Sequence, residues 1–129
     1  MSDAEDIDDI RERKREELQS KAGSPDDPVH VEGGDHLEEL LEDNRVVLVD
    51  FYADWCGPCK MLEPTVEEIA AETDAAVLKV DIDAHQDLAG EYQVQGVPTL
   101  YVFVDGEPAD RMVGVQDEAT LREKIAAHA

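Results

Sequence analysis

Residues 50–60 read Asp-Phe-Tyr-Ala-Asp-Trp-Cys-Gly-Pro-Cys-Lys, and this stretch holds both cysteines and the single tryptophan of the 129-residue chain. Residues 46–52, which lead into it, are almost continuously apolar and rich in β-branched and aromatic side chains, as in a strand buried on both faces. After Cys59, apolar residues recur at steps of three and four, which indicates one face of a helix. Cys56 is therefore expected where a strand ends and a helix begins, with Pro58 in the first helical turn, where its missing N–H costs nothing.

This pair of cysteines could close a small disulfide ring or supply half of a zinc site. A structural zinc site needs four ligands, normally with a second close pair, but the chain has no further cysteine and its four histidines are scattered. Attachment of a c-type haem would need a histidine directly after the second cysteine, where Lys60 stands. We therefore expect a redox pair without a metal or a bound cofactor.

The expected helix N-terminus has chemical consequences for the two sulfur atoms. Its free N–H groups and the positive end of its dipole favour negative charge. Cys56 is thus predicted to be partly thiolate near neutrality, while Cys59, one turn further in, should be more buried. A reactive thiolate with a second thiol behind it is suited to thiol–disulfide exchange.

Several separate motifs, in this order, resemble those of the thioredoxin family. Residues 47–60 are similar to the family's active-site segment, residues 79–83 to its third strand, residues 92–100 to the segment with its cis-proline, and Gly114 to a glycine near the active site. The resemblance covers residues 29–129. It implies the thioredoxin fold, an α/β domain with a mixed central β-sheet of four to five strands and helices on both faces.

Residues 1–28 precede this domain as a charged N-terminal extension and linker, which we expect to be partly helical or disordered. The linker, residues 23–28, is rich in glycine, serine and proline. The family core does not need such an extension, so that its role stays open.

The resemblance also implies roles for four residues. Cys56 would attack the disulfide of a target protein, and Cys59 would then attack Cys56 and release the reduced target. Asp50 lies in an otherwise buried strand, and burial without a partner should raise its pKa. By its match to the family, Asp50 helps to deprotonate Cys59, and Lys79 on the neighbouring strand lies close to Asp50.

A surface for docking of target proteins follows from the same resemblance. The Val97–Pro98 bond is expected to be cis and to pack against the disulfide. Trp55 is expected to line the active-site surface. The complete set of expected docking residues is Trp55, Gly57, Pro58, Val97, Pro98 and Gly114.

The remaining elements follow from local patterns. We expect a short edge strand at residues 29–31, a helix capped by Asp35 and Glu38, a strand at residues 76–82 parallel to the strand before Cys56, and a short helix at residues 85–93. Asp105-Gly106 predicts a hairpin between strands at residues 100–104 and 109–113, and Asp117 should cap a last helix. Asp81, Asp83 and Asp87 lack the spacing of an EF-hand loop and should form a solvated acidic edge.

The charge of the chain is strongly one-sided. It has 33 acidic and 11 basic residues, for a net charge of −22, spread along its whole length. We therefore expect no nucleic-acid or anionic-membrane partner, because both require basic surfaces. The excess predicts a halophilic protein that is adapted to a cytoplasm with molar salt. The acidic start lacks the apolar core of a signal peptide, so we expect a cytoplasmic location.

These features predict a protein-disulfide reductase that cycles between a Cys56/Cys59 dithiol and its disulfide. For this family the partner that restores the dithiol is usually a flavin-containing thioredoxin reductase, and we expect the chain to be a monomer. Two alternatives remain open at this point: a disulfide oxidase or isomerase, and a non-catalytic binding subunit with the same fold.

Overall fold

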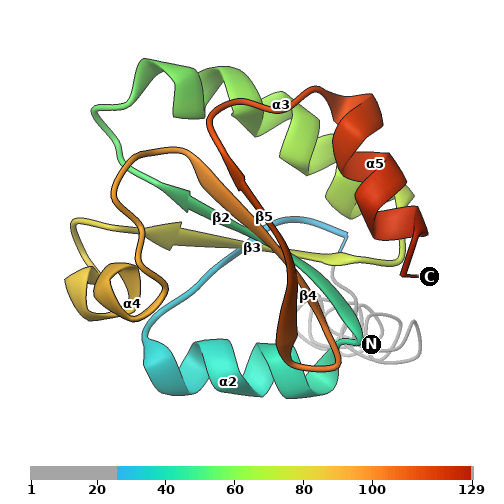
Figure 1. Ribbon diagram of the computed structural model, residues 1–129, viewed down its shortest axis with the longest axis horizontal. Coiled ribbons are helices and arrows are strands. Elements are labelled where there is room, and N and C mark those ends of the chain that lie inside the picture. Colours follow the sequence, from blue (N-terminus) through green and yellow to red (C-terminus); the bar gives the residue numbers. More distant parts are fainter. Residues whose placement is uncertain (1–25, 129) are drawn as a thin grey trace, which may run out of the picture.

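The computed structural model describes residues 26–128 (Figure 1). The predicted extension therefore lies outside the described residues, apart from residues 26–28. The elements in chain order are β1 (Val29–His30), α2 (Gly34–Asp43), β2 (Val46–Tyr52), α3 (Gly57–Glu72), β3 (Ala76–Asp81), α4 (Gln86–Glu91), β4 (Thr99–Val104), β5 (Glu107–Val113) and α5 (Glu118–Ala126).

The five strands form one mixed sheet in the order β1-β3-β2-β4-β5. β1 and β2 run parallel to β3, whereas β4 pairs antiparallel with both β2 and β5. Helices α3 and α5 cover one face of this sheet, and α2 and α4 cover the other (Figure 1). The predicted α/β architecture is confirmed, with β2 at the centre of the sheet.

The alternating side chains of β2 divide the core into two parts. Val47, Val49 and Phe51 belong to a cluster with the buried leucines of α2 and α4, while Leu48 packs with apolar residues of α3 and α5. Successive side chains of a strand point to opposite faces. Asp50, two residues after Leu48, therefore faces the side of the sheet that α3 covers.

The predicted hairpin turn and the cap of the last helix are both present. Asp105 and Gly106 have positive φ angles of 52° and 84°, the combination that a two-residue turn between twisted strands requires. The Asp117 side chain accepts a hydrogen bond of 2.7 Å from the Thr120 N–H at the start of α5.

The predicted cap of α2 is wrong. The N-cap residue is Gly33, which has no side chain to offer, and Asp35 already lies inside the first turn. Its carboxylate can still interact favourably with the helix dipole from there. The backbone N–H of Glu32 donates instead to Nδ1 of His36, at 2.9 Å.

Candidate active site

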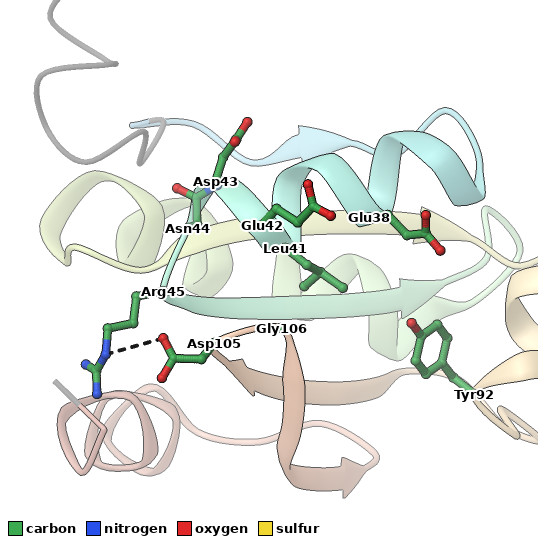
Figure 2. Close-up of a pocket in the computed structure, with 9 residues that line it drawn as sticks. All are labelled: Glu38, Leu41, Glu42, Asp43, Asn44, Arg45, Tyr92, Asp105 and Gly106. Atoms are coloured by element: carbon green, nitrogen blue, oxygen red, sulfur yellow. Dashed lines mark ion pairs between the residues drawn. The ribbon is translucent and has the colours of Figure 1, made fainter.

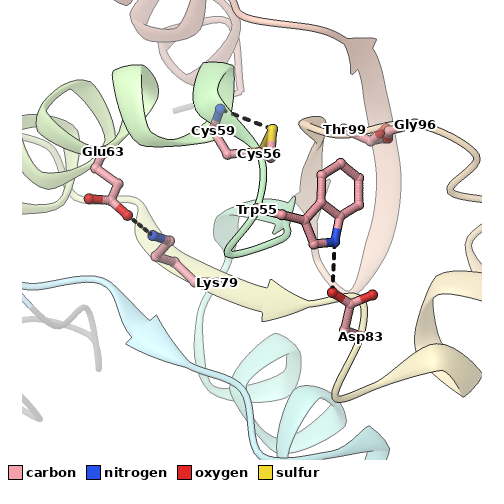
Figure 3. Close-up of a disulfide and its surroundings, with 8 residues drawn as sticks. All are labelled: Trp55, Cys56, Cys59, Glu63, Lys79, Asp83, Gly96 and Thr99. Carbon is pink, nitrogen blue, oxygen red and sulfur yellow. Dashed lines mark hydrogen bonds and ion pairs between the residues drawn. A yellow bond between two sulfur atoms is a disulfide. The ribbon is translucent and has the colours of Figure 1, made fainter.

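The two cysteines lie where β2 ends and α3 begins, as the sequence predicted. Cys56 is the N-cap residue of α3, Cys59 lies in its first turn, and Pro58 stands between them at the start of the helix. The cysteines form a disulfide, with their Cα atoms 5.3 Å apart (Figure 3).

The backbone supports the sulfur atom of Cys56. The N–H of Cys59 donates a hydrogen bond of 3.2 Å to Cys56 Sγ, so that sulfur takes the place of the usual capping oxygen (Figure 3). A donor at this position favours negative charge on the sulfur once the disulfide is reduced. This geometry supports Cys56 as the nucleophile.

The difference in burial that we expected between the two cysteines is small. Cys56 is 4% exposed and Cys59 is 3% exposed. Both lie in an apolar cluster with Ala53, against which Tyr52 and Val97 pack. The cluster encloses both sulfur-bearing residues while the disulfide is closed.

Trp55 precedes the disulfide and is mostly exposed, with 69% of its surface accessible. Its indole N–H donates to Oδ2 of Asp83 at 2.9 Å, from the loop that follows β3 (Figure 3). Asp83 is exposed, as expected for a solvated acidic edge, but its carboxylate also accepts this hydrogen bond. The position of Asp83 could have indicated the contact, because β2 and β3 are parallel and their carboxyl ends meet at one edge of the sheet.

The other expected docking residues divide by exposure. Gly57 and Pro58 are exposed, Val97 and Gly114 are partly buried, and Pro98 is buried. The Val97–Pro98 peptide bond is cis, and the Gly114 N–H donates to the Pro98 carbonyl oxygen at 2.8 Å. The structure thus places Gly114 beside Pro98, and Val97 beside the cysteines.

Asp50 is fully buried beneath α3. Neither carboxylate oxygen has a hydrogen-bond partner among the described residues. Burial raises the pKa of Asp50 from 3.8 to about 7, with Lys79 opposing this rise and Glu63 adding to it. Asp50 can therefore gain or lose a proton near neutral pH.

Lys79 is the register partner of Asp50 on β3, as the resemblance implied. Its Nζ atom, however, makes its ion pair with Oε1 of Glu63 on α3, at 3.5 Å (Figure 3). The same ammonium lies 4.3 Å from the centre of the Tyr52 ring. Glu63 did not figure among the predicted site residues, although it stands four positions after Cys59 on the same helix.

A pocket lies at the end of β2 that is opposite to the disulfide. This pocket, of about 660 Å³, lies between the end of α2 and the β4–β5 turn, and Arg45 and Asp105 form an ion pair of 3.7 Å at its edge (Figure 2). Arg45 directly precedes β2, whereas Cys56 follows it, so this pocket is separate from the disulfide.

The described residues hold no group of three or more His, Cys, Asp or Glu side chains that could bind a metal ion. Nor is any described helix long and apolar enough to cross a membrane. Both findings concern residues 26–128 alone.

Comparison with known proteins agrees with this geometry. The thioredoxin family model matches residues 27–127. The thioredoxin of Mycobacterium tuberculosis H37Rv is 43% identical over 100 residues, covering 76% of this chain and 86% of the relative. The thioredoxin of Staphylococcus epidermidis RP62A is 48% identical over 88 residues, covering 67% and 85%.

A solved structure extends the similarity to three dimensions. A mutant thioredoxin from Halobacterium salinarum NRC-1 is 55% identical, covers 81% of this chain and 93% of its own, and superposes with a TM-score of 0.80. Because the family model spans almost all of the described residues and the two curated relatives are 43% and 48% identical, the chain belongs to the thioredoxin family of thiol–disulfide oxidoreductases.

Proposed function

We propose that the chain reduces disulfides in target proteins through a two-step exchange in which Cys56 attacks and Cys59 resolves. The observation that carries this assignment is the hydrogen bond that the Cys59 N–H donates to Cys56 Sγ at the N-terminus of α3. It favours the thiolate on Cys56 and leaves Cys59 as the second thiol.

In the first step, the Cys56 thiolate attacks one sulfur of the target disulfide. A bond forms between Cys56 Sγ and that sulfur, the target's S–S bond breaks, and its other sulfur leaves as a thiolate. In the second step, Cys59 loses its proton and attacks Cys56 Sγ. The mixed disulfide breaks, the target leaves with both sulfurs reduced, and the Cys56–Cys59 disulfide forms.

Asp50 is the proposed acceptor for the Cys59 proton. It faces α3, the helix that carries Cys59, and burial brings its pKa to about 7. A base with a pKa near the working pH combines a sufficient ionised fraction with proton affinity. Lys79, in register with Asp50, is the cation that favours the ionised form of Asp50.

Target proteins are proposed to dock on the surface formed by Trp55, Gly57, Pro58, Val97 and Gly114, whereas Pro98, expected in this surface, is buried beside Gly114. Trp55 supplies a large exposed aromatic face, and aromatic side chains are enriched at the centres of protein interfaces. Val97 continues this surface beside the cysteines.

The family acts on disulfide-containing substrates and needs a reductase, which for this chain we propose to be a thioredoxin reductase. This reductase returns two electrons and two protons to the Cys56–Cys59 disulfide. We further propose that the chain works as a monomer in a cytoplasm of high salt, without nucleic-acid or membrane partners. Its net charge of −22 and its similarity to the Halobacterium salinarum protein support the adaptation to salt.

Replacing each cysteine by serine tests the assignment. With insulin as the target, Cys56→Ser should abolish both reduction and covalent capture, because the attacking thiolate is gone. Cys59→Ser should abolish turnover but accumulate a mixed disulfide between Cys56 and insulin, visible on a non-reducing gel. Capture by the Cys56→Ser variant, through Cys59, would contradict the assignment.

A further inference from the structure

The side chain of Glu63 lies at the boundary between the buried acid and solvent. Glu63 stands on α3 one turn after Cys59, and its side chain is 48% exposed. Lys79, whose side chain is 8% exposed, reaches it from β3 across a distance of 3.5 Å (Figure 3). The ion pair thus links the helix that carries both redox sulfurs to the strand beside Asp50.

The Lys79 ammonium group has two carboxylates on the same side of the sheet, those of Asp50 and Glu63. Lys79 is the register partner of Asp50 in the parallel β2–β3 ladder, so both side chains extend on the face that α3 covers. Yet its ion pair is with Glu63, and both oxygens of Asp50 lack a hydrogen-bond partner among the described residues. Lys79 is therefore paired with Glu63, the more exposed of the two carboxylates, and not with the buried Asp50.

The other surroundings of Asp50 contribute little compensating charge. Its register partner on β4 is the apolar Leu100, and α3 presents the disulfide cysteine Cys59 and the carboxylate of Glu63. On its own strand, Tyr52 is an uncharged ring whose pKa is raised chiefly by burial. The charges of Lys79 and Glu63 therefore dominate the field at Asp50.

A water-accessible hollow of about 380 Å³ lies outside this ion pair. Its lining includes Glu63, Lys79, Glu67 and His30. Lys79 lines this hollow and is also the register partner of the buried Asp50. The Glu63–Lys79 pair thus lies at a solvent-accessible edge while both of its charges act on Asp50.

We propose that Glu63 is a positioning residue for the exchange reaction, which draws the Lys79 ammonium away from Asp50 and so raises the pH range over which Asp50 takes up and releases a proton. The proposal rests on the function proposed for Asp50. Glu63 touches neither the target nor the sulfur atoms in this account. It acts through Lys79, and the direct repulsion between the two carboxylates works in the same direction.

The test is a titration of the Asp50 side chain, followed by the ¹³C chemical shift of its carboxyl group. The oxidised protein is used, because disulfide-bonded cysteines do not titrate, and KCl is kept at one concentration. Glu63→Gln keeps the size of the side chain but removes its charge. Its Asp50 midpoint should fall by about 0.2 to 0.7 of a pH unit, the range expected for an interaction with a half-exposed charge.

Glu67→Gln is the matched control. Glu67 lies one turn further along α3 and lines the same hollow, but it forms no ion pair with Lys79 in the described part of the chain. The Glu67→Gln substitution should leave the Asp50 midpoint within about 0.1 of a pH unit of the wild-type value, since the charge of Glu67 is further along the helix and screened by solvent. An unchanged or raised midpoint in Glu63→Gln would overturn the proposal, as would an equal fall in both variants.

A double-mutant cycle tests whether Glu63 acts through Lys79. In a Lys79→Met background, which keeps an aliphatic side chain without the charge, Glu63→Gln should lower the Asp50 midpoint by less than half as much. An undiminished effect would show that the two carboxylates interact without the lysine, which would overturn the positioning role.

The same variants then report on catalysis. The pH midpoint for release of the target from its mixed disulfide should fall in Glu63→Gln together with the Asp50 midpoint. If the Asp50 titration shifts while the release profile stays unchanged, the positioning of Lys79 is correct and the proposed catalytic role of Asp50 is the part that fails. The two failures are therefore distinguishable.

Discussion

Asp50 and Lys79 face each other in register across the β2–β3 ladder, but Lys79 makes its ion pair with Glu63 and Asp50 has no hydrogen-bond partner among the described residues. A carboxylate in this environment is costly to ionise, because desolvation opposes its charge. The chain keeps this acid at the centre of its sheet, beneath the helix that carries both redox cysteines. Its burial there does not favour stability, and it fits the proton exchange that we propose for Asp50.

The burial of Asp50 should make stability depend on pH. Its folded-state pKa of about 7 exceeds the ordinary value of 3.8, so between these values the folded protein holds a proton that the unfolded chain has released. The free energy of unfolding should therefore fall as the pH rises through this window and become level above about pH 7.

Asp50→Asn removes this dependence. Relative to the wild type, the variant should gain roughly 2 to 4 kcal/mol between pH 4 and pH 8, since each pKa unit corresponds to about 1.4 kcal/mol. Urea unfolding of the oxidised proteins at pH 4, 6 and 8, in constant KCl, measures the difference. Asp54→Asn, at an exposed carboxylate, is the control and should follow the wild type. Parallel curves for wild type and Asp50→Asn would contradict the account.

The hydrogen bond between Trp55 and Asp83 should matter for target binding. Asp83→Ala removes the acceptor and leaves the indole free to rotate, so that binding must order it again. Ordering one such side chain costs about 0.5 to 1.5 kcal/mol, which corresponds to a rise in KM of about 2- to 10-fold. Steady-state reduction of insulin measures KM and kcat, and kcat should stay within about 2-fold of the wild-type value.

Asp87→Ala, at an exposed carboxylate on α4, is the control for this substitution and should change neither constant. Fluorescence anisotropy of Trp55 should fall in Asp83→Ala and stay unchanged in the control. A loss of kcat with an unaltered KM would place Asp83 in the chemical steps instead of in docking.

The cap of α5 offers a local test of stability. Asp117→Ala removes the acceptor of the Thr120 N–H and should lower the melting temperature by a few degrees. Asp117→Ser should retain most of the stability, because serine also caps well. Glu123→Ala, inside the same helix, should have little effect or a slight stabilising one. Equal losses in Asp117→Ala and Glu123→Ala would exclude a capping effect.

The charge of the chain predicts that salt stabilises the fold. From residue 29 onward, the chain has 23 acidic and 6 basic residues, for a net charge of −17. The Debye length shrinks from about 10 Å at 0.1 M salt to about 3 Å at 1 M. The melting temperature should therefore rise with KCl, with most of the screening gain reached by about 1 M. A melting temperature that is independent of KCl would refute the adaptation to salt.

A pair of carboxylates beside the larger pocket provides a matched variant for this experiment. Glu38 and Glu42 lie four residues apart on α2, where like charges repel (Figure 2). Glu38→Gln combined with Glu42→Gln should raise the melting temperature in dilute buffer and reduce the gain from KCl. A full gain in this variant would mean that the salt acts on other groups.

The elements that local patterns specify are present in the predicted order, although β5 begins at Glu107, two residues before the predicted strand. The apolar run of β2 and the helical periodicity after Cys59 placed the cysteines at the start of α3, and Asp105-Gly106 marked the hairpin turn. The cap of α2 was misassigned because Asp35 and Gly33 are both compatible with a helix start, and the choice depends on where the chain leaves β1.

The contacts between distant residues could not be predicted in the same way. The Glu63–Lys79 ion pair joins α3 to β3, and the Trp55–Asp83 hydrogen bond joins two loops at one edge of the sheet. Each depends on how the helix and loops lie over the sheet, which the spacing of residues along the chain does not determine. In a chain with so many carboxylates, composition gives no means to single out Glu63. For Asp83, the parallel pairing of β2 and β3 indicates that its loop lies near that of Trp55, but not which side chain forms the hydrogen bond.

The reduction potential of the Cys56–Cys59 couple tests the central claim most directly. It can be measured in high KCl by equilibrating the chain with dithiol–disulfide mixtures and following the fluorescence of Trp55, the single tryptophan. A reductase requires a potential below that of the cytosolic glutathione pool, about −220 to −260 mV. We predict such a low potential, so that the dithiol donates electrons to target disulfides. A potential well above that of the pool would make the disulfide the reactive form and would contradict a function in disulfide reduction.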